Sequence, residues 1–111
     1  LVSIGERAFF AATKLAGTLA VPNTVTTIGN DAFVNTKLAG LDLSKATSLV
    51  EIGERAFSNT NLAGTLKMGP AVKIIGTSAF ADTKLTGLEL SDATSLVEIE
   101  ADAFSEIVKL H

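Results

Sequence analysis

The chain has 111 residues, 47% of them hydrophobic and 19% charged, and a formal net charge of −3. This length allows one domain with a continuous core, and the composition excludes a disordered chain. The apolar runs are far shorter than the ~20 residues that span a bilayer, which argues against membrane insertion. The acidic balance argues against a nucleic-acid partner, and the lack of cysteine excludes disulfides, thiolate nucleophiles and cysteine zinc sites.

The start of the chain shows the expected elements in their order. The piece GERAF, residues 5–9, predicts one helical or 3-10 turn with Ala and Phe on its inner face. The period-two spacing of Leu19 and Val21 then predicts a short strand with one buried face, and the same spacing recurs at Leu41 and Leu43, Leu66 and Met68, and Leu88 and Leu90. Pro22 marks a bend, as Gly69-Pro70 does in the third coil, and residues 25–28 then return on the opposite side of the coil with Val25 and Ile28 facing inward.

The same order of elements recurs along the chain. An Ala-Phe pair follows an isoleucine in every coil, and the phenylalanines are Phe9, Phe33, Phe57, Phe80 and Phe104. Their spacing of 23 to 24 residues is a solenoid period. We therefore predict one domain over residues 1–111, with four full repeats and a partial one. Two versions of the strand alternate, since LAGTL opens the first and third and LAGLDL or LTGLEL the second and fourth.

Four positions keep the same residue (Ala, Phe, Thr and Leu) in three successive coils, while the positions between them vary. They belong to the stretches AFVNTKL, AFSNTNL and AFADTKL, at 32–38, 56–62 and 79–85. We expect the Phe side chains to stack from coil to coil, because neighbouring parallel strands lie ~4.8 Å apart. The Ala before each Phe should be small so that the turn can approach the sheet, and the Leu should close the coil. The Thr is predicted to satisfy backbone groups that the tight turn leaves unpaired.

The pattern Ile-Gly-x-x-Ala-Phe, followed by a small residue, a Leu, a strand and a bend, resembles the leucine-rich repeats of the BspA type, found on bacterial and protist surface proteins. Ala46 and Ala93 stand where the better-known leucine-rich pattern has Asn. The family often has Cys in the column that this chain fills with Thr13, Thr36, Thr60 and Thr83. The resemblance implies a curved solenoid whose strand face binds macromolecules in adhesion or host contact, outside the cell or on its surface.

The predicted fold is a right-handed solenoid of leucine-rich-repeat type, with 23–24 residues per coil. Short parallel strands form one face, and short strands plus helical or 3-10 turns form the other. No catalytic, cofactor-binding or metal-binding motif is visible, because the carboxylates Glu6, Asp31, Glu54 and Asp102 fall on outward turns where charges are expected to be solvated. The chain is therefore predicted not to be an enzyme.

Two sets of exposed positions are candidates for binding. Lys14, Lys37 and Lys84 recur in one column, which could bind a polyanion, although a solubilising role is favoured. The outward row of the strands varies while its inward neighbours hold, as a binding face on a rigid frame requires. The candidate binding residues are Thr18, Ala20, Asp42, Ser44, Thr65, Lys67, Glu89 and Ser91.

The predicted function is recognition of a protein or cell-surface macromolecule through the strand face. The alternative is a structural spacer or a self-assembling unit of a larger surface protein. Head-to-tail association is expected because apolar end coils attract one another. Charge favours the same arrangement: residues 1–85 hold eight basic and six acidic side chains, and residues 86–111 hold one basic and six acidic.

Overall fold

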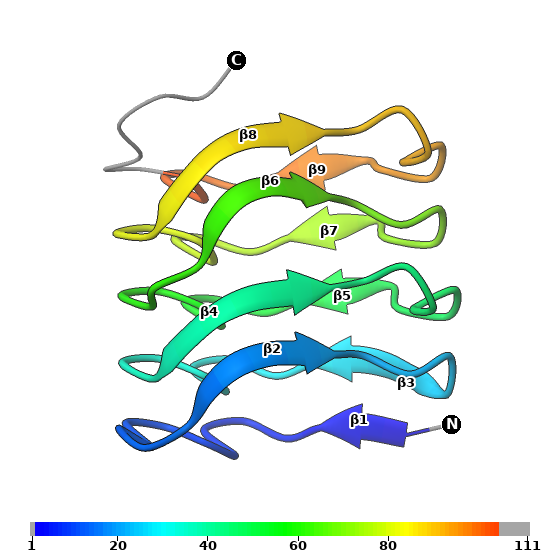
Figure 1. The fold of residues 1–111 in the computed structure, drawn as a ribbon. Helices are drawn as coiled ribbons and strands as arrows, with labels where there is room; N and C mark the ends of the chain where they lie inside the picture. The colour runs from blue at the N-terminus through cyan, green and yellow to red at the C-terminus, as the bar shows by residue number, and fades with distance from the viewer. Residues whose placement is uncertain (1, 105–111) are drawn as a thin grey trace.

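The computed structural model describes residues 2–104, which form a solenoid with strands on two opposite sides (Figure 1). Five strands make the back sheet: β1 (Val2–Ile4), β3 (Val25–Ile28), β5 (Glu51–Ile52), β7 (Ile74–Ile75) and β9 (Glu98–Ile99). Four longer strands make the strand face: β2 (Ala16–Ala20), β4 (Lys37–Asp42), β6 (Ala63–Lys67) and β8 (Lys84–Glu89). The predicted repeat solenoid is confirmed.

The back sheet is continuous, with all neighbouring strands parallel in the order β1-β3-β5-β7-β9. Each isoleucine lies beside the isoleucine of the next coil, so Ile28 is opposite Ile52 and Ile52 is opposite Ile75. These three side chains are fully buried. The predicted inward position of this segment is confirmed.

The strand face is divided. β2 pairs with β4 and β6 pairs with β8, but no ladder joins β4 to β6. Figure 1 shows the wider gap between β4 and β6. The coils remain joined where the strands begin, since the Asn61 N–H donates to the Leu38 carbonyl at 2.9 Å, so the break lies farther along.

The two versions of the strand fit each other within each pair. Thr18 lies opposite Gly40, and a Cβ on that glycine would lie 2.7 Å from Thr18 Oγ1. Thr65 and Gly87 repeat this arrangement in the second pair. The alternation of versions therefore pairs the coils two by two.

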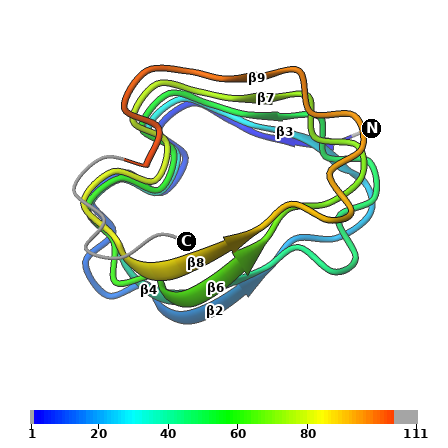
Figure 2. The same cartoon turned by 90° about the horizontal axis from the view of Figure 1, so that it is seen from above.

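The predicted phenylalanine column is confirmed. Ring centroids of successive Phe side chains lie 5.1 to 5.3 Å apart, with interplanar angles of 5° to 11°. Phe33, Phe57 and Phe80 are buried, and the alanine before each of them is buried too. Figure 2 shows the turns of successive coils lying over one another.

The threonine column follows the prediction in two central coils. The hydroxyls of Thr36 and Thr60 donate to the carbonyls of Phe33 and Phe57, each at 2.9 Å. Thr83 is equally buried, but its hydroxyl has no hydrogen-bond partner within residues 2–104. Thr13, in the first coil, is exposed.

The predicted helical or 3-10 turns are wrong, since residues 2–104 contain only strands, turns and irregular segments. Across the GERAF turn of the third coil (53–57) and the two residues after it, the N–H groups of Arg55, Phe57 and Asn59 donate to carbonyls of the next coil. Those of Ala56 and Ser58 donate three residues back in their own coil. A helix would keep all these bonds within one segment. Here every second bond joins two coils.

The alternation of hydrogen bonds depends on residues with positive φ. Among residues 2–104, nine non-glycine residues adopt φ between 54° and 62°: Arg7, Ala11, Asp31, Asn35, Arg55, Asn59, Ser78, Asp82 and Asp102. Five of them are Asn or Asp, the residues that tolerate this left-handed region best. The sequence therefore held a partial signal for these turns.

Glycines set the close approach of the coils on the back side. A Cβ on Gly53 would lie 2.7 Å from backbone atoms of Gly29 and Asn30, and Gly29 and Gly76 have equally close backbone neighbours. Gly5, in the first coil, has nothing within 4 Å of that position. The column therefore holds coils at backbone contact, and the last coil carries Glu100 in its place.

The last coils depart from the predicted burial. Leu90 was expected to face inward, but it is 37% exposed, whereas its counterpart Leu43 is buried. The coil with β4 and Leu43 is followed by the coil that carries β6, whereas no described strand follows β8 on the strand face. Burial at this position therefore depends on the neighbouring coil as well as on the strand.

Candidate functional site

All eight candidate binding residues are exposed. Ala20 lies opposite Asp42, and Lys67 lies opposite Glu89, so the predicted row runs across each strand pair. Ser44 and Ser91 follow the ends of β4 and β8. The row is interrupted between β4 and β6, where the ladder is missing.

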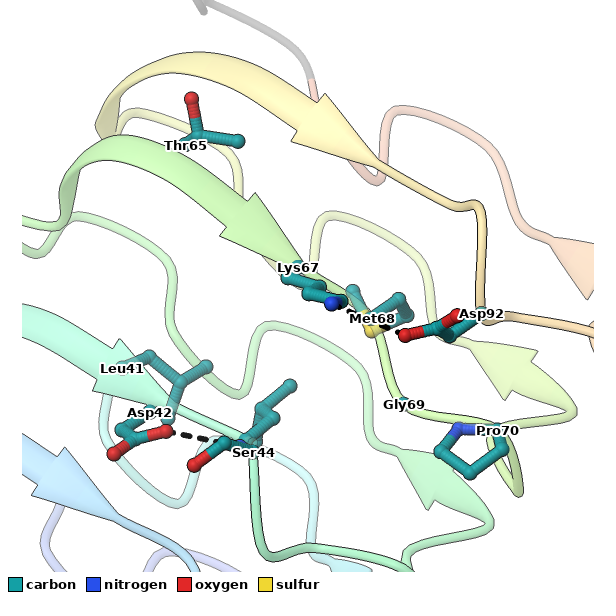
Figure 3. A pocket seen from close by; sticks show the side chains of 10 residues that line it. Leu41, Asp42, Ser44, Thr65, Lys67, Met68, Gly69, Pro70 and Asp92 are labelled. Carbon is teal, nitrogen blue, oxygen red and sulfur yellow. Dashed lines mark hydrogen bonds and ion pairs between the residues drawn. The ribbon is translucent and has the colours of Figure 1, made fainter.

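A hollow of about 410 Å³ lies at this interruption (Figure 3). Its polar lining includes four of the candidate residues, namely Asp42, Ser44, Thr65 and Lys67. The remaining lining residues are Leu41, Leu43, Met68, Gly69, Pro70 and Asp92. The structure therefore brings together residues from the ends of three successive front strands.

Ser44 holds the carboxylate of Asp42 on one side of the hollow. The Ser44 N–H donates to Asp42 Oδ1 at 2.9 Å. Hydrogen bonding by Ser44, from its side chain and then its backbone, lowers the pKa of Asp42, and the positive charge of Lys45 acts in the same direction. Asp42 therefore stays ionised at neutral pH.

Lys67 and Asp92 form an ion pair on the other side of the hollow, with Nζ and Oδ2 3.1 Å apart (Figure 3). The hydrogen bond that Lys67 donates to Asp92, followed by the charges of Asp92 and Glu89, raises the pKa of Lys67. Glu89 accepts a hydrogen bond from Ser91 Oγ at 2.9 Å. Both groups of the pair are more than half exposed, so the pair contributes little to stability.

Two further hollows follow the same edge of the strand face. One, of about 250 Å³, is lined by residues that include Ala20, Asp42 and Ser44. The other, of about 420 Å³, is lined by Pro22, Asn23, Ser44, Lys45 and Thr47. Ser44 borders all three hollows. Thr18, Glu89 and Ser91 line none of them.

Sequence reasoning missed the lining residues that lie beyond the strand ends. Met68 and Pro70 were assigned to a buried strand face and to a bend, and Asp92 was not singled out. The available signal was the pair Gly69-Pro70, which comes shortly after the third strand of the strand face. Such a pair marks a change of chain direction. Nothing in one coil alone shows that the next coil stands apart from it.

The comparison with known families settles the class of repeat. The family model described as BspA type leucine rich repeat region matches residues 1–111, in six copies. The chain belongs to the BspA-type leucine-rich repeat family. No significant match was found among curated proteins or among solved structures. Within residues 2–104, no helix is long and apolar enough to cross a membrane.

The outer turns of this BspA-type solenoid carry structural contacts. Asp31 and Arg55 join adjacent coils, with Arg55 Nε 2.7 Å and Nη2 3.2 Å from the two carboxylate oxygens. Asp31 was expected to be solvated, but its side chain is only 13% exposed, and the hydrogen bond from Arg55 lowers its pKa. Asn30 Oδ1 accepts the Glu54 N–H at 2.8 Å. These polar groups therefore hold the coils together.

The lysine column of this BspA-type chain is exposed. Lys37 and Lys84 open β4 and β8, and Lys14 lies just before β2. The N–H groups of Lys37 and Lys84 donate to the carbonyls of Leu15 and Leu62. Their backbone thus belongs to the coil-to-coil bonding.

Proposed function

We propose that this BspA-type solenoid is a non-enzymatic scaffold that recognises a protein or another cell-surface macromolecule through its strand face. The observation that carries the proposal is the hollow between β4 and β6, bordered by exposed candidate residues on a repeated frame. Stacked rings and a continuous back sheet hold that frame rigid. Leucine-rich repeat families are generally non-enzymatic and BspA-type repeats are often surface-associated, so the proposed site of action is outside the cell.

The test replaces the charges of the exposed row. The triple variant Asp42→Ala, Lys67→Ala and Glu89→Ala is compared with the natural chain on an array of purified extracellular proteins and glycans. Binding to a specific array member should be lost while the melting temperature changes little, because the replaced side chains are exposed.

A matched control removes the same charges elsewhere. Glu6→Ala, Glu54→Ala and Lys73→Ala also delete two acidic groups and one basic group at exposed positions away from the strand face. This control should bind as the natural chain does. Binding retained by the strand-face triple, or lost equally in both triples, would contradict the proposal.

Self-assembly is the second candidate function, favoured by apolar side chains on the first and last described coils. Phe9 is 45% exposed and Ile99 43% exposed, whereas their counterparts in the central coils are buried. Within residues 2–104, β1 and β9 are the outermost strands of a parallel sheet, and an outermost strand can accept a further strand. We propose that two copies associate head to tail through these surfaces.

Light scattering against concentration tests the association at 0.1 M and 1 M salt. Apolar contact should persist at high salt, while charge attraction fades as the Debye length falls from ~10 Å to ~3 Å. Ile99→Glu should reduce the association. A chain that stays monomeric at both salts up to high concentration would rule out this candidate.

A further inference from the structure

The hollow between β4 and β6 combines an apolar floor with charged flanks. Leu43 and Met68 are buried beneath it, and Pro70 forms part of its wall. Asp42 lies on one flank, and the ion pair of Lys67 with Asp92 lies on the other (Figure 3). Such a lining accommodates an aliphatic stem that ends in a polar group.

The charges of the lining select the sign of that polar group. Asp42 and Asp92 are negative and Lys67 is positive, which leaves one negative charge in excess. The Lys67 charge is already offset by Asp92 at 3.1 Å and by nearby Glu89. Lys45 stands beside Asp42 and balances Glu89, so the excess persists when both neighbours are counted. An anion would therefore meet repulsion and a cation attraction.

The carboxylate of Asp42 is prepared to accept further hydrogen bonds. It is ionised, and the groups of Ser44 orient it. An ionised carboxylate has about four acceptor positions, so the bonds from Ser44 leave capacity for an outside donor. Charge-assisted bonds to guanidinium or ammonium groups are the strongest that such a carboxylate forms.

We propose that this hollow receives a basic side chain, arginine or lysine, from an extended segment of the protein partner. The inference rests on the proposed function and names the chemistry of the ligand at that site. The alkyl stem lies over Leu43 and Met68, and the cation lies against Asp42 and the Lys67–Asp92 pair. The segment continues over Ser44, which borders the neighbouring hollows along the same edge.

The direct test uses small probes on the whole chain. N-acetyl-arginine methylamide and its lysine analogue are titrated into the ¹⁵N-labelled protein at low salt, with the uncharged norleucine and the acidic glutamate analogues beside them. The basic probes should give saturable amide shifts within residues 41–44 and 65–69, and the other two should not. Comparing the two basic probes shows which cation is preferred.

Variants that replace one carboxylate by an amide test whether the Asp42 charge binds the probes without disturbing the fold. Asp42→Asn keeps an oxygen that can accept the Ser44 N–H, and it should weaken binding of the basic probes by about threefold to fivefold, as for an exposed ion pair. Asp82→Asn makes the same charge change on an exposed outer turn, at a positive φ that Asn tolerates. This control should bind the probes unchanged.

The outcomes separate this inference from the proposed function. Equal shifts with norleucine, no shifts with either basic probe, or an equal loss in the Asp42 and Asp82 variants would overturn the basic-side-chain site. If the strand-face triple variant still loses its array partner, the recognition function stands without this site. If the triple variant keeps its partner while the probes bind at the hollow, the site stands and the recognition function fails.

Discussion

The back sheet and the strand face belong to the same coils but differ in continuity. On the back side every described coil repeats the isoleucine and the Ala-Phe pair, and the sheet runs unbroken from β1 to β9. On the strand face two versions alternate, and the strands pair two by two. Strict repetition therefore gives a continuous frame, and alternation opens a hollow in it.

The largest expected effect is on the repeated side. Phe57→Ala empties a fully buried position between two stacked rings, so it should lower the free energy of unfolding by about 3 to 5 kcal/mol. Denaturant titration measures the loss. A loss below about 1 kcal/mol would contradict the stacked core, and with it the contrast between the back side and the strand face.

The second largest loss of stability is expected for substitutions in the glycine column of the back side. Gly53→Ala places a Cβ 2.7 Å from backbone atoms of the preceding coil, so it should cost about 1 to 3 kcal/mol. Gly5→Ala meets no atom within 4 Å and should stay within about 0.5 kcal/mol. On the strand face, Gly40→Ala meets the Thr18 side chain and should fall between them, because a side chain can rotate. Equal melting temperatures for the three variants would remove the difference between the faces.

The threonine column offers a smaller comparison. Thr60→Val deletes a hydroxyl that donates to the Phe57 carbonyl and should cost about 1 kcal/mol. Thr83→Val removes a buried hydroxyl without a partner among the described residues, so it should be neutral or stabilising. Urea midpoints of the two variants provide the measurement. A loss at Thr83 as large as that at Thr60 would mean that the Thr83 hydroxyl is bonded in solution.

The smallest effect concerns the ion pair of the outer turns. Arg55 lowers the pKa of Asp31, so the stability from this pair is present above the ordinary Asp pKa of ~3.9 and is lost as the pH falls through the lowered value. Arg55→Ala should lower the midpoint of unfolding slightly at pH 7, and by less at acid pH, because solvent screens an exposed pair. Unfolding curves at pH 7 and at acid pH measure this dependence.

Glu54→Ala is the control for that pair. Glu54 is exposed on the same turn and lies 3.6 Å from Arg55 Nη2, so the variant should stay within about 0.5 kcal/mol at every pH. An Arg55 variant that loses as much stability in acid as at neutral pH would show that its contribution does not come from the Asp31 charge.

The sequence predicted the features that recur in every coil. The period, the Phe column and the inward isoleucines follow from the repeat itself, because each position meets its own counterpart in the next coil. The turns were predicted wrongly, since Arg55 and Ser78 adopt positive φ although their residue types give no such signal. Hydrogen bonds to the next coil stabilise that conformation, and these are invisible in one coil.

The candidate site was predicted in part for a related reason. Exposure of Asp42 and Lys67 follows from strand alternation, which a sequence displays. The hollow between them depends on which strand version lies beside which, as does the fit of Thr18 over Gly40. The position of Asp92 against Lys67 likewise depends on how the chain leaves β8.

The bends beside the hollows have a consequence for altering this protein. The path from strand face to back sheet takes nine residues from Leu19 to Ile28 and eleven from Leu41 to Ile52, yet Ile28 and Ile52 stay in register. Connections of different length at this edge are thus compatible with the same sheet register. Lengthening such a loop further costs little closure entropy. Foreign loops grafted at these bends should leave the stack intact, which makes the edge a place where specificity can be rebuilt without refolding the frame.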